Sequence, residues 1–198
     1  MPSVFRRRKM MTVKNVVIVL ADGFEEVEAI APADVLKRLG CNVILAGLKN
    51  MTVTGAHGIS VNADAVLDGV DCINADAFVL PGGLPGATNL RDDARIMEIL
   101  KKRDAAGKIC AAICASPAAV LASAEIVKDR VITGYPGCEG LSKGETVTTS
   151  GAPAEISENL VTGKGPGAAF AFAAAIAKAL SFTDDQIGKL FDGMFVAR

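Results

Sequence analysis

The hydrophobic pattern alternates between short, continuous apolar runs and longer stretches in which apolar residues recur every three or four positions. Runs of the first kind are typical of strands buried on both faces, and stretches of the second kind indicate amphipathic helices. The expected strands span residues 16–20, 42–47, 77–80, 109–113, 131–133, 147–149 and 160–162, with a short hairpin-like pair within 53–61. The expected helices span residues 25–39, 92–106, 168–180 and 184–191, with another after Ser116. This alternation predicts a mostly parallel sheet covered by helices on both faces.

The stretch 108–123 attracts attention because a cysteine stands at the junction of two predicted elements. Cys114 follows the apolar strand 109–113, and Ser116 and Pro117 are start signals for a helix. A thiol at such a junction faces unpaired backbone N–H groups and the positive end of the helix dipole, which favour the thiolate. The pattern resembles a nucleophile elbow with sulfur as the nucleophile. A small buried hydrophobic residue is the alternative, because most free cysteines have that role.

Other polar or glycine-rich segments also follow predicted strands. Glutamates 25, 26 and 28 begin the first helix, and spacing does not choose among them, although the ring of Pro32 must crowd the carbonyl of Glu28. Gly82 and Gly83 follow another strand, and glycines there allow close backbone approach and free N–H groups. Ligands bind outside the carboxyl ends of parallel strands, so we expect these segments, Cys114 and Tyr135 to converge on one pocket.

Composition narrows the classes of function. The chain has 198 residues, 51% of them hydrophobic, and a net charge of −1, so it does not indicate a nucleic-acid partner. No apolar run reaches the roughly 18 residues that suggest a membrane span. The five cysteines show no CxxC spacing and are accompanied by one histidine, His57, so we predict neither a disulfide framework nor a metal site. Reduced thiols are typical of a cytoplasmic protein.

Two further segments need an interpretation. Residues 1–12 are rich in arginine and are interpreted as a flexible leader before a single domain over 13–198, with a mitochondrial or other organellar targeting segment as the alternative. The glycines at 163, 165 and 167 resemble part of a dinucleotide-binding loop. However, no strand or acidic residue completes that unit, so no nucleotide cofactor is predicted.

Four ordered motifs resemble one known family. They are Ala21-Asp-Gly-Phe-Glu-Glu-Val-Glu28, Val79-Leu-Pro-Gly-Gly83, Ala111-Ala-Ile-Cys-Ala-Ser-Pro117 and Gly165-Pro-Gly-Ala-Ala-Phe170. Together they resemble the signature blocks of the ThiJ/PfpI superfamily, in the branch of the parkinsonism-associated protein DJ-one, over residues 14–180. The resemblance implies a flavodoxin-like three-layer α/β/α sandwich, a homodimer and no cofactor.

The resemblance also implies a role for each motif. Cys114 matches the reactive thiolate, Glu28 the carboxyl group that shares a proton with it, and the N–H groups of Gly83 and Ala115, beside Gly82, the oxyanion site. The implied activities are glyoxalase without glutathione, which converts methylglyoxal to lactate, and deglycation of protein adducts. The alternative is a redox-sensing and chaperone-like role in oxidative stress, in which the cysteine is oxidised to sulfinate without turnover.

The chain departs from the family pattern at two positions. Tyr135 stands where members best known for glyoxalase activity have histidine, and a phenol of pKa about 10 is a poor base near neutrality. Tyr135 is therefore expected to donate a hydrogen bond at most, and weak turnover is the expected consequence. Ala115 stands where the peptidase branch has histidine, so a cysteine peptidase is not expected. The resemblance places His57 at a dimer contact or at the pocket rim.

Overall fold

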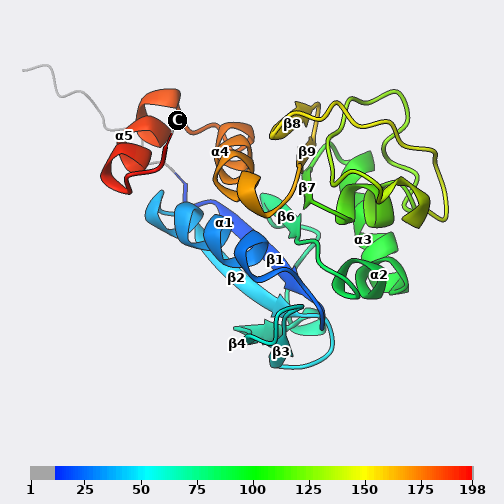
Figure 1. The fold of residues 1–198 in the computed structure, drawn as a ribbon. Coiled ribbons are helices and arrows are strands. Elements are labelled where there is room, and N and C mark those ends of the chain that lie inside the picture. Colours follow the sequence, from blue (N-terminus) through cyan, green and yellow to red (C-terminus); the bar gives the residue numbers. More distant parts are fainter. Residues whose placement is uncertain (1–11, 198) are drawn as a thin grey trace, which may run out of the picture.

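The computed structural model describes residues 12–197, so nearly all of the expected leader lies outside the described residues. Seven strands form the central sheet in the order β5-β2-β1-β6-β7-β9-β8, and every pair is parallel except β8–β9 (Figure 1). Their bounds are β1 Asn15–Leu20, β2 Asn42–Gly47, β5 Ala65–Val66, β6 Ala77–Leu80, β7 Ile109–Ile113, β8 Ala154–Ser157 and β9 Leu160–Gly163. β3 Thr52–Thr54 and β4 Ser60–Asn62 form the separate hairpin that the sequence predicts.

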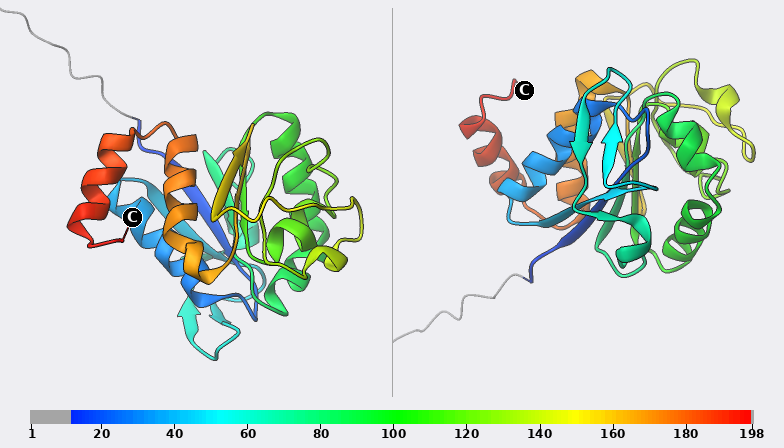
Figure 2. Two further views of the ribbon diagram at one scale, coloured as in Figure 1. Left: turned by 45° about the horizontal axis from the view of Figure 1, so that its top comes forward. Right: turned by 90° about the horizontal axis from the view of Figure 1, so that it is seen from below.

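Helices cover both faces of the sheet, which confirms the predicted α/β sandwich (Figure 2). α1 Glu26–Arg38, α4 Ala169–Ala179 and α5 Asp184–Gly193 lie on one face. α2 Gly86–Arg91, α3 Ala94–Ala105 and the short π-helical segment η2 Pro117–Leu121 lie on the other. Among the helices of residues 12–197, none has the length and apolar character needed to cross a bilayer.

The register of the central strands brings their carboxyl ends to one edge of the sheet. Ile18 of β1 pairs with Val79 of β6, Val79 with Ala111 of β7, and Ala111 with Val161 of β9. These strands are almost completely buried, because side chains on both of their faces meet helices. The segments that follow β1, β6 and β7 therefore emerge beside one another.

Some predicted elements are wrong, and the sheet explains why. Residues 131–133 and 147–149 contribute only one isolated bridge, between Ile132 and Thr149. They form no sheet strands because β9 is already paired with β7 on one side and β8 on the other. β8 and α2 were not predicted, and α2 begins within a proline- and glycine-rich stretch that resembles a loop.

Candidate active site

The backbone at Cys114 has the geometry of a nucleophile elbow. Its φ of +64° lies in the left-handed region, which a residue with a side chain rarely adopts. Two hydrogen bonds hold this conformation: Cys114 N–H donates to the carbonyl of Gly163 at 2.9 Å, and its carbonyl accepts from Tyr135 N–H at 2.8 Å. The side chain is 9% exposed. The elbow thus holds the thiol at the sheet edge with a narrow opening to solvent.

The glycine loop after β6 packs directly against the elbow. A Cβ atom at Gly82 would lie 2.6 Å from Cys114 Cβ and 2.8 Å from Glu28 Oε2, so no side chain fits there. Gly83 has a φ of +85°, and a Cβ atom there would collide with the backbone before α1. The backbone N–H groups of Gly83 and Ala115 both act to lower the pKa of the Cys114 thiol. They therefore lie where they can stabilise negative charge at the sulfur.

Glu28 is the glutamate that the fold places beside the thiol. Its side chain is fully buried, and Oε2 accepts a hydrogen bond from Gly82 N–H at 2.9 Å. Oε1 is buried without a hydrogen-bond partner. Burial raises the pKa of Glu28 to about 7, although interactions with the Cys114 thiol and Gly82 N–H act in the opposite direction. This carboxyl group can therefore carry or release a proton near neutrality.

The pKa of Cys114 shifts in the direction opposite to the expected one. Burial raises it to about 12, and the negative charge of Glu28 contributes to the increase. The expectation of a lowered pKa is wrong because a buried carboxylate and a thiolate repel each other, and because η2 is too short to act as a full helix dipole. When Glu28 holds the proton, that repulsion disappears and its O–H can donate to sulfur. Cys114 and Glu28 therefore form an electrostatically coupled pair, in which each group affects the pKa of the other.

The other two glutamates of the motif have structural partners. Glu25 caps α1, because its carboxylate accepts from Glu28 N–H at 2.8 Å. Glu26 binds the β3–β4 turn through His57: Oε1 accepts from the backbone N–H at 2.8 Å, and Oε2 lies 2.7 Å from Nδ1. Ligand atoms of Glu25, Glu26 and His57 lie within 4.8 Å of one another, but the carboxylates already accept N–H donors. The fold thus joins His57 to Glu26, not to the coupled pair.

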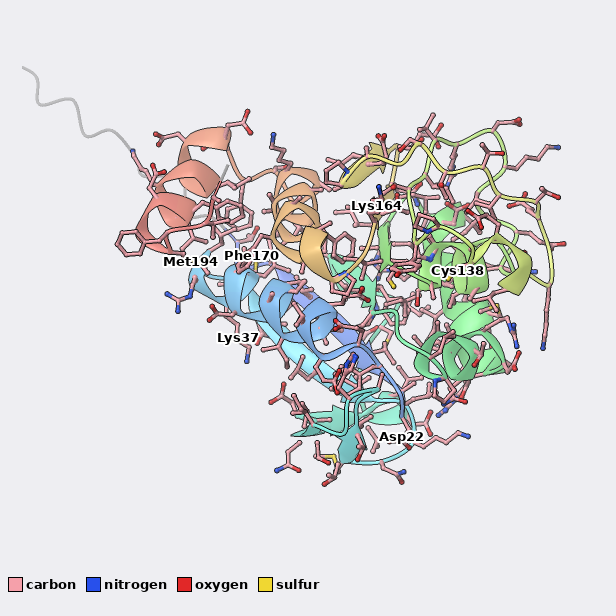
Figure 3. The ribbon with its side chains drawn as sticks, viewed as in Figure 1. Asp22, Lys37, Cys138, Lys164, Phe170 and Met194 are labelled. Carbon is pink, nitrogen blue, oxygen red and sulfur yellow. The ribbon has the colours of Figure 1, made fainter. Side chains whose placement is uncertain are left out.

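Tyr135 reaches the site through its backbone. Its N–H binds Cys114, whereas its side chain is 50% exposed and lies over Gly165. The ring lines an apolar cavity of about 370 Å³ with Pro136, Pro153 and Lys164 among its walls, and Figure 3 labels Lys164 on this side of the molecule. The role of its hydroxyl as a hydrogen-bond donor stays a prediction.

Ser116 connects two segments of the site, a role that the sequence pattern does not indicate. This side chain is fully buried, and its hydroxyl donates to the carbonyl of Pro81 at 2.6 Å. The bond joins the segment after the elbow to the segment before Gly82 and so fixes the spacing between them. The sequence indicates Ser116 only as a helix start, because the partner carbonyl is 35 residues away.

The described geometry can be compared with known proteins. The family model described as the DJ-1/PfpI family matches residues 14–179. The chain belongs to this family. A deglycase of Pyrococcus abyssi is 37% identical over 167 residues, which cover 84% of this chain and 99% of that protein. A glutathione-independent glyoxalase of Caenorhabditis elegans is 35% identical over 172 residues, which cover 86% of this chain and 91% of that protein.

A solved structure of a family member resembles nearly the whole of this chain. The structure of oxidized Toxoplasma gondii DJ-1 matches with a TM-score of 0.86 and 30% identity, covering 94% of this chain and 100% of that one. This similarity agrees with the flavodoxin-like architecture that the sequence predicts. Some relatives are longer: the chain matches 37% of DJ-1 homolog B and 43% of DJ-1 homolog A of Arabidopsis thaliana, so it spans about two fifths of those proteins.

Proposed function

We propose that the protein converts small α-oxoaldehydes to 2-hydroxy acids without glutathione, with methylglyoxal and lactate as the simplest pair. The observation that carries this proposal is the coupling of the elbow thiol of Cys114 to the buried carboxyl group of Glu28. The names of two relatives, a deglycase and a glutathione-independent glyoxalase, support carbonyl chemistry of this kind. Such a thiol and proton carrier are the two groups that the reaction requires.

The reaction begins with addition of sulfur to the aldehyde. Cys114 attacks the aldehyde carbon C1, its thiol proton passes through Glu28 to the oxygen at C1, and a hemithioacetal forms, while the N–H groups of Gly83 and Ala115 stabilise the transient oxyanion. Glu28 then removes the proton from C1 and returns it to C2. The hydroxyl proton at C1 passes to the oxygen at C2, so that the ketone becomes an alcohol and C1 becomes a thioester. Water then hydrolyses the thioester, which releases the hydroxy acid and regenerates the thiol. The sum is one aldehyde and one water consumed for each acid formed.

The same site limits the size of the carbonyl substrate. Cys114 is 9% exposed and Glu28 is fully buried, so a small aldehyde reaches both groups more easily than an adduct on a folded protein. We therefore rank free α-oxoaldehydes above glycated proteins as substrates. Glycated short peptides are the adducts most compatible with this opening.

Measuring lactate after incubation of the purified protein with methylglyoxal tests the proposal. Wild-type protein is expected to form lactate, and Cys114→Ala is expected to form none above the uncatalysed rate. Cys41→Ala is the matched control, because Cys41 is a buried thiol beside Asp76 and Lys14, away from the glycine loop. Equal lactate formation by wild type and Cys114→Ala would contradict the proposal.

A second candidate function is oxidative sensing by the same thiol. The observation that favours it is the unpartnered Oε1 of Glu28, which can donate a hydrogen bond to a sulfinate on Cys114 when protonated. The comparison structure of Toxoplasma gondii DJ-1 is described as oxidized. Mass spectrometry after mild peroxide treatment tests this function. Oxygen uptake at Cys114 no faster than at Cys41 or Cys72 would exclude it.

We also propose that the protein forms a homodimer through the exposed side of α1. An apolar groove of about 420 Å³ lies between α1 and β4 and extends to Phe170 of α4. Val27, Ile30 and Ile59 are exposed there by 49%, 40% and 59%. Light scattering is expected to give a dimer for the wild type and a monomer for Ile30→Asp. An unchanged mass for this variant would contradict the assignment of the interface.

A further inference from the structure

A second cysteine lies in the turn that contacts the elbow. Cys138 N–H donates to the carbonyl of Tyr135 at 3.2 Å and closes a β-turn over residues 135–138. Tyr135 N–H in turn donates to the carbonyl of Cys114 at 2.8 Å. Two backbone hydrogen bonds thus connect the residue that carries the second thiol to the elbow. The side chain of Cys138 is half-buried and packs against the core, and Figure 3 labels it beside the helices on this side of the sheet.

The charge of one carboxyl group, that of Glu28, acts on both thiols. Burial raises the pKa of Cys138, and the negative charges of Glu139 and Glu28 raise it further. Glu28 has the same influence on Cys114. The three remaining cysteines, after burial, respond to charges elsewhere: Asp76 and Lys14 for Cys41, Arg103 and Asp71 for Cys72, and Arg103, Asp104 and Arg130 for Cys110. Cys114 and Cys138 are therefore the two thiols whose pKa values the charge of Glu28 raises.

The turn that carries Cys138 lies in a long segment with little regular structure. Between residues 134 and 153, regular structure is limited to η3 Glu139–Leu141 and one bridge. Side chains fix the loop beyond the turn: Arg91 donates to the carbonyl of Leu141 at 2.9 Å, and Lys143 pairs with Asp92. In the turn itself, nothing lies within 4 Å of the Cβ position of Gly137. A disulfide between Cys114 and Cys138 requires their Cα atoms to lie about 4.4 to 6.8 Å apart.

We propose that Cys138 is the resolving thiol of Cys114 in the two-electron reduction of a hydroperoxide. Glu28 takes the proton of the Cys114 thiol, the resulting thiolate attacks the terminal oxygen, and the O–O bond breaks. Cys114 becomes a sulfenic acid, and the alkoxide takes the proton from Glu28 and leaves as an alcohol. Cys138 then attacks this sulfur, the S–O bond breaks, water leaves and a Cys114–Cys138 disulfide forms. A small dithiol returns both cysteines to thiols and is itself oxidised to a disulfide. This cycle does not depend on turnover of α-oxoaldehydes.

Cys138 also gives a reason why oxidation of Cys114 can stop before sulfinate. Sulfenic acid either meets a second hydroperoxide and gains oxygen or meets a thiol and forms a disulfide. Because Cys138 belongs to the same chain and its turn is hydrogen-bonded to the elbow, its attack is intramolecular and does not depend on the concentration of a second protein. At low hydroperoxide the disulfide is therefore the expected product, and at high hydroperoxide sulfinate competes with it.

Oxidation with one equivalent of tert-butyl hydroperoxide, followed by intact-mass analysis and peptide mapping, tests the proposal. Wild type is expected to lose two hydrogens and to yield one peptide pair that links Cys114 to Cys138. Cys138→Ser is expected to gain oxygen at Cys114 instead, and its consumption of hydroperoxide with dithiothreitol is expected to fall at least tenfold. Cys41→Ala, the matched control, is expected to behave as wild type. Circular dichroism and thermal melting verify that each variant folds.

Three outcomes overturn the proposal. The first is oxygen uptake at Cys114 at equal rates in wild type and Cys138→Ser, without a disulfide. The second is a disulfide that joins Cys114 to a cysteine other than Cys138, and the third is a Cys114 that hydroperoxide does not oxidise. Lactate formation by the reduced Cys138→Ser protein separates this result from the proposed function, because that reaction requires no second thiol.

Discussion

Two glutamates near the start of α1 show how neighbouring buried carboxyl groups acquire different chemistry. Glu26 meets the β3–β4 turn, where it accepts from the N–H groups of His57 and Ile59 and lies 2.7 Å from the imidazole of His57. Glu28, two residues later, meets the elbow edge, where one N–H group binds Oε2 and Oε1 has no partner. The side chains are 6% and 0% exposed, so both are buried.

Glu26 and Glu28 accept hydrogen bonds from different N–H donors, and their pKa values shift in opposite directions. Burial alone would raise the pKa of Glu26, but hydrogen bonds from His57 and the nearby backbone together lower it. At Glu28, burial prevails and raises the pKa to about 7. On the hairpin side the carboxylate is therefore a fixed charge that anchors a turn. On the elbow side the raised pKa allows the carboxyl group to hold a proton near neutrality.

The largest expected effect is on turnover. Glu28→Gln preserves the shape of the side chain but removes the mobile proton, so kcat/KM for methylglyoxal is expected to fall by about 100-fold or more. Glu26→Gln, the matched control on the other face of α1, is expected to change kcat/KM by less than about threefold, because it binds only the turn. Steady-state kinetics checks both. Equal losses in the two variants would show that the two glutamates do not differ in the proposed way.

The next effect is a pH dependence of stability. The folded-state pKa of Glu28 is raised from 4.5 to about 7, so the folded state binds more protons than the unfolded state between these values. Stability is thus complete below pH 4.5 and is lost as the pH rises through 7, by up to about 3 kcal/mol. Urea unfolding of wild type and Glu28→Gln over this range is expected to give a smaller slope for the variant. A slope that Glu28→Gln leaves unchanged would assign the effect to another group.

Substitution of a glycine is expected to have different effects at the elbow and in the β3–β4 turn. An alanine methyl at Gly82 meets Cys114 Cβ and Glu28 Oε2, so Gly82→Ala is expected to reduce turnover about tenfold or more and to cost about 1–3 kcal/mol of stability. Gly58→Ala introduces a side chain at a φ of +83° with nothing within 4 Å, and is expected to cost about 1 kcal/mol without affecting turnover. Steady-state kinetics measures the turnover of both variants, and urea unfolding measures their stability. Unimpaired turnover in Gly82→Ala would contradict the described packing.

The smallest expected effect on turnover concerns the hairpin. Glu26→Ala leaves backbone N–H groups of the β3–β4 turn without their acceptor, so it is expected to destabilise the protein by about 1–3 kcal/mol. Faster hydrogen exchange at His57 and Ile59 should accompany this loss. His57→Gln keeps the backbone donor and should leave both exchange at Ile59 and turnover nearly unchanged. A large loss of turnover in His57→Gln would show that this residue belongs to the catalytic machinery.

Much of the fold follows from the sequence pattern. The runs at 77–80 and 109–113 coincide with β6 and β7, because a strand buried on both faces needs apolar residues at every position. The glycine loop also follows from the sequence. Gly83 has a positive φ angle, and Gly82 lies too close to Cys114 and Glu28 to carry a side chain, so both positions favour glycine. Segments whose pairing depends on a free sheet edge, such as 131–133, do not follow from local pattern.

The sequence by itself determined the order of the central strands β1, β2, β6, β7 and β9 and of most helices, and it placed Cys114, Gly82 and a group of glutamates after strands that end at one edge. It did not distinguish among Glu25, Glu26 and Glu28, because helical spacing is the same whether a carboxylate meets solvent, a turn or a thiol. Tertiary structure made that choice by deciding which N–H donors each side chain meets. It also decided the direction of the Cys114 pKa, because burial and the charge of a neighbour depend on residues that are distant in the chain.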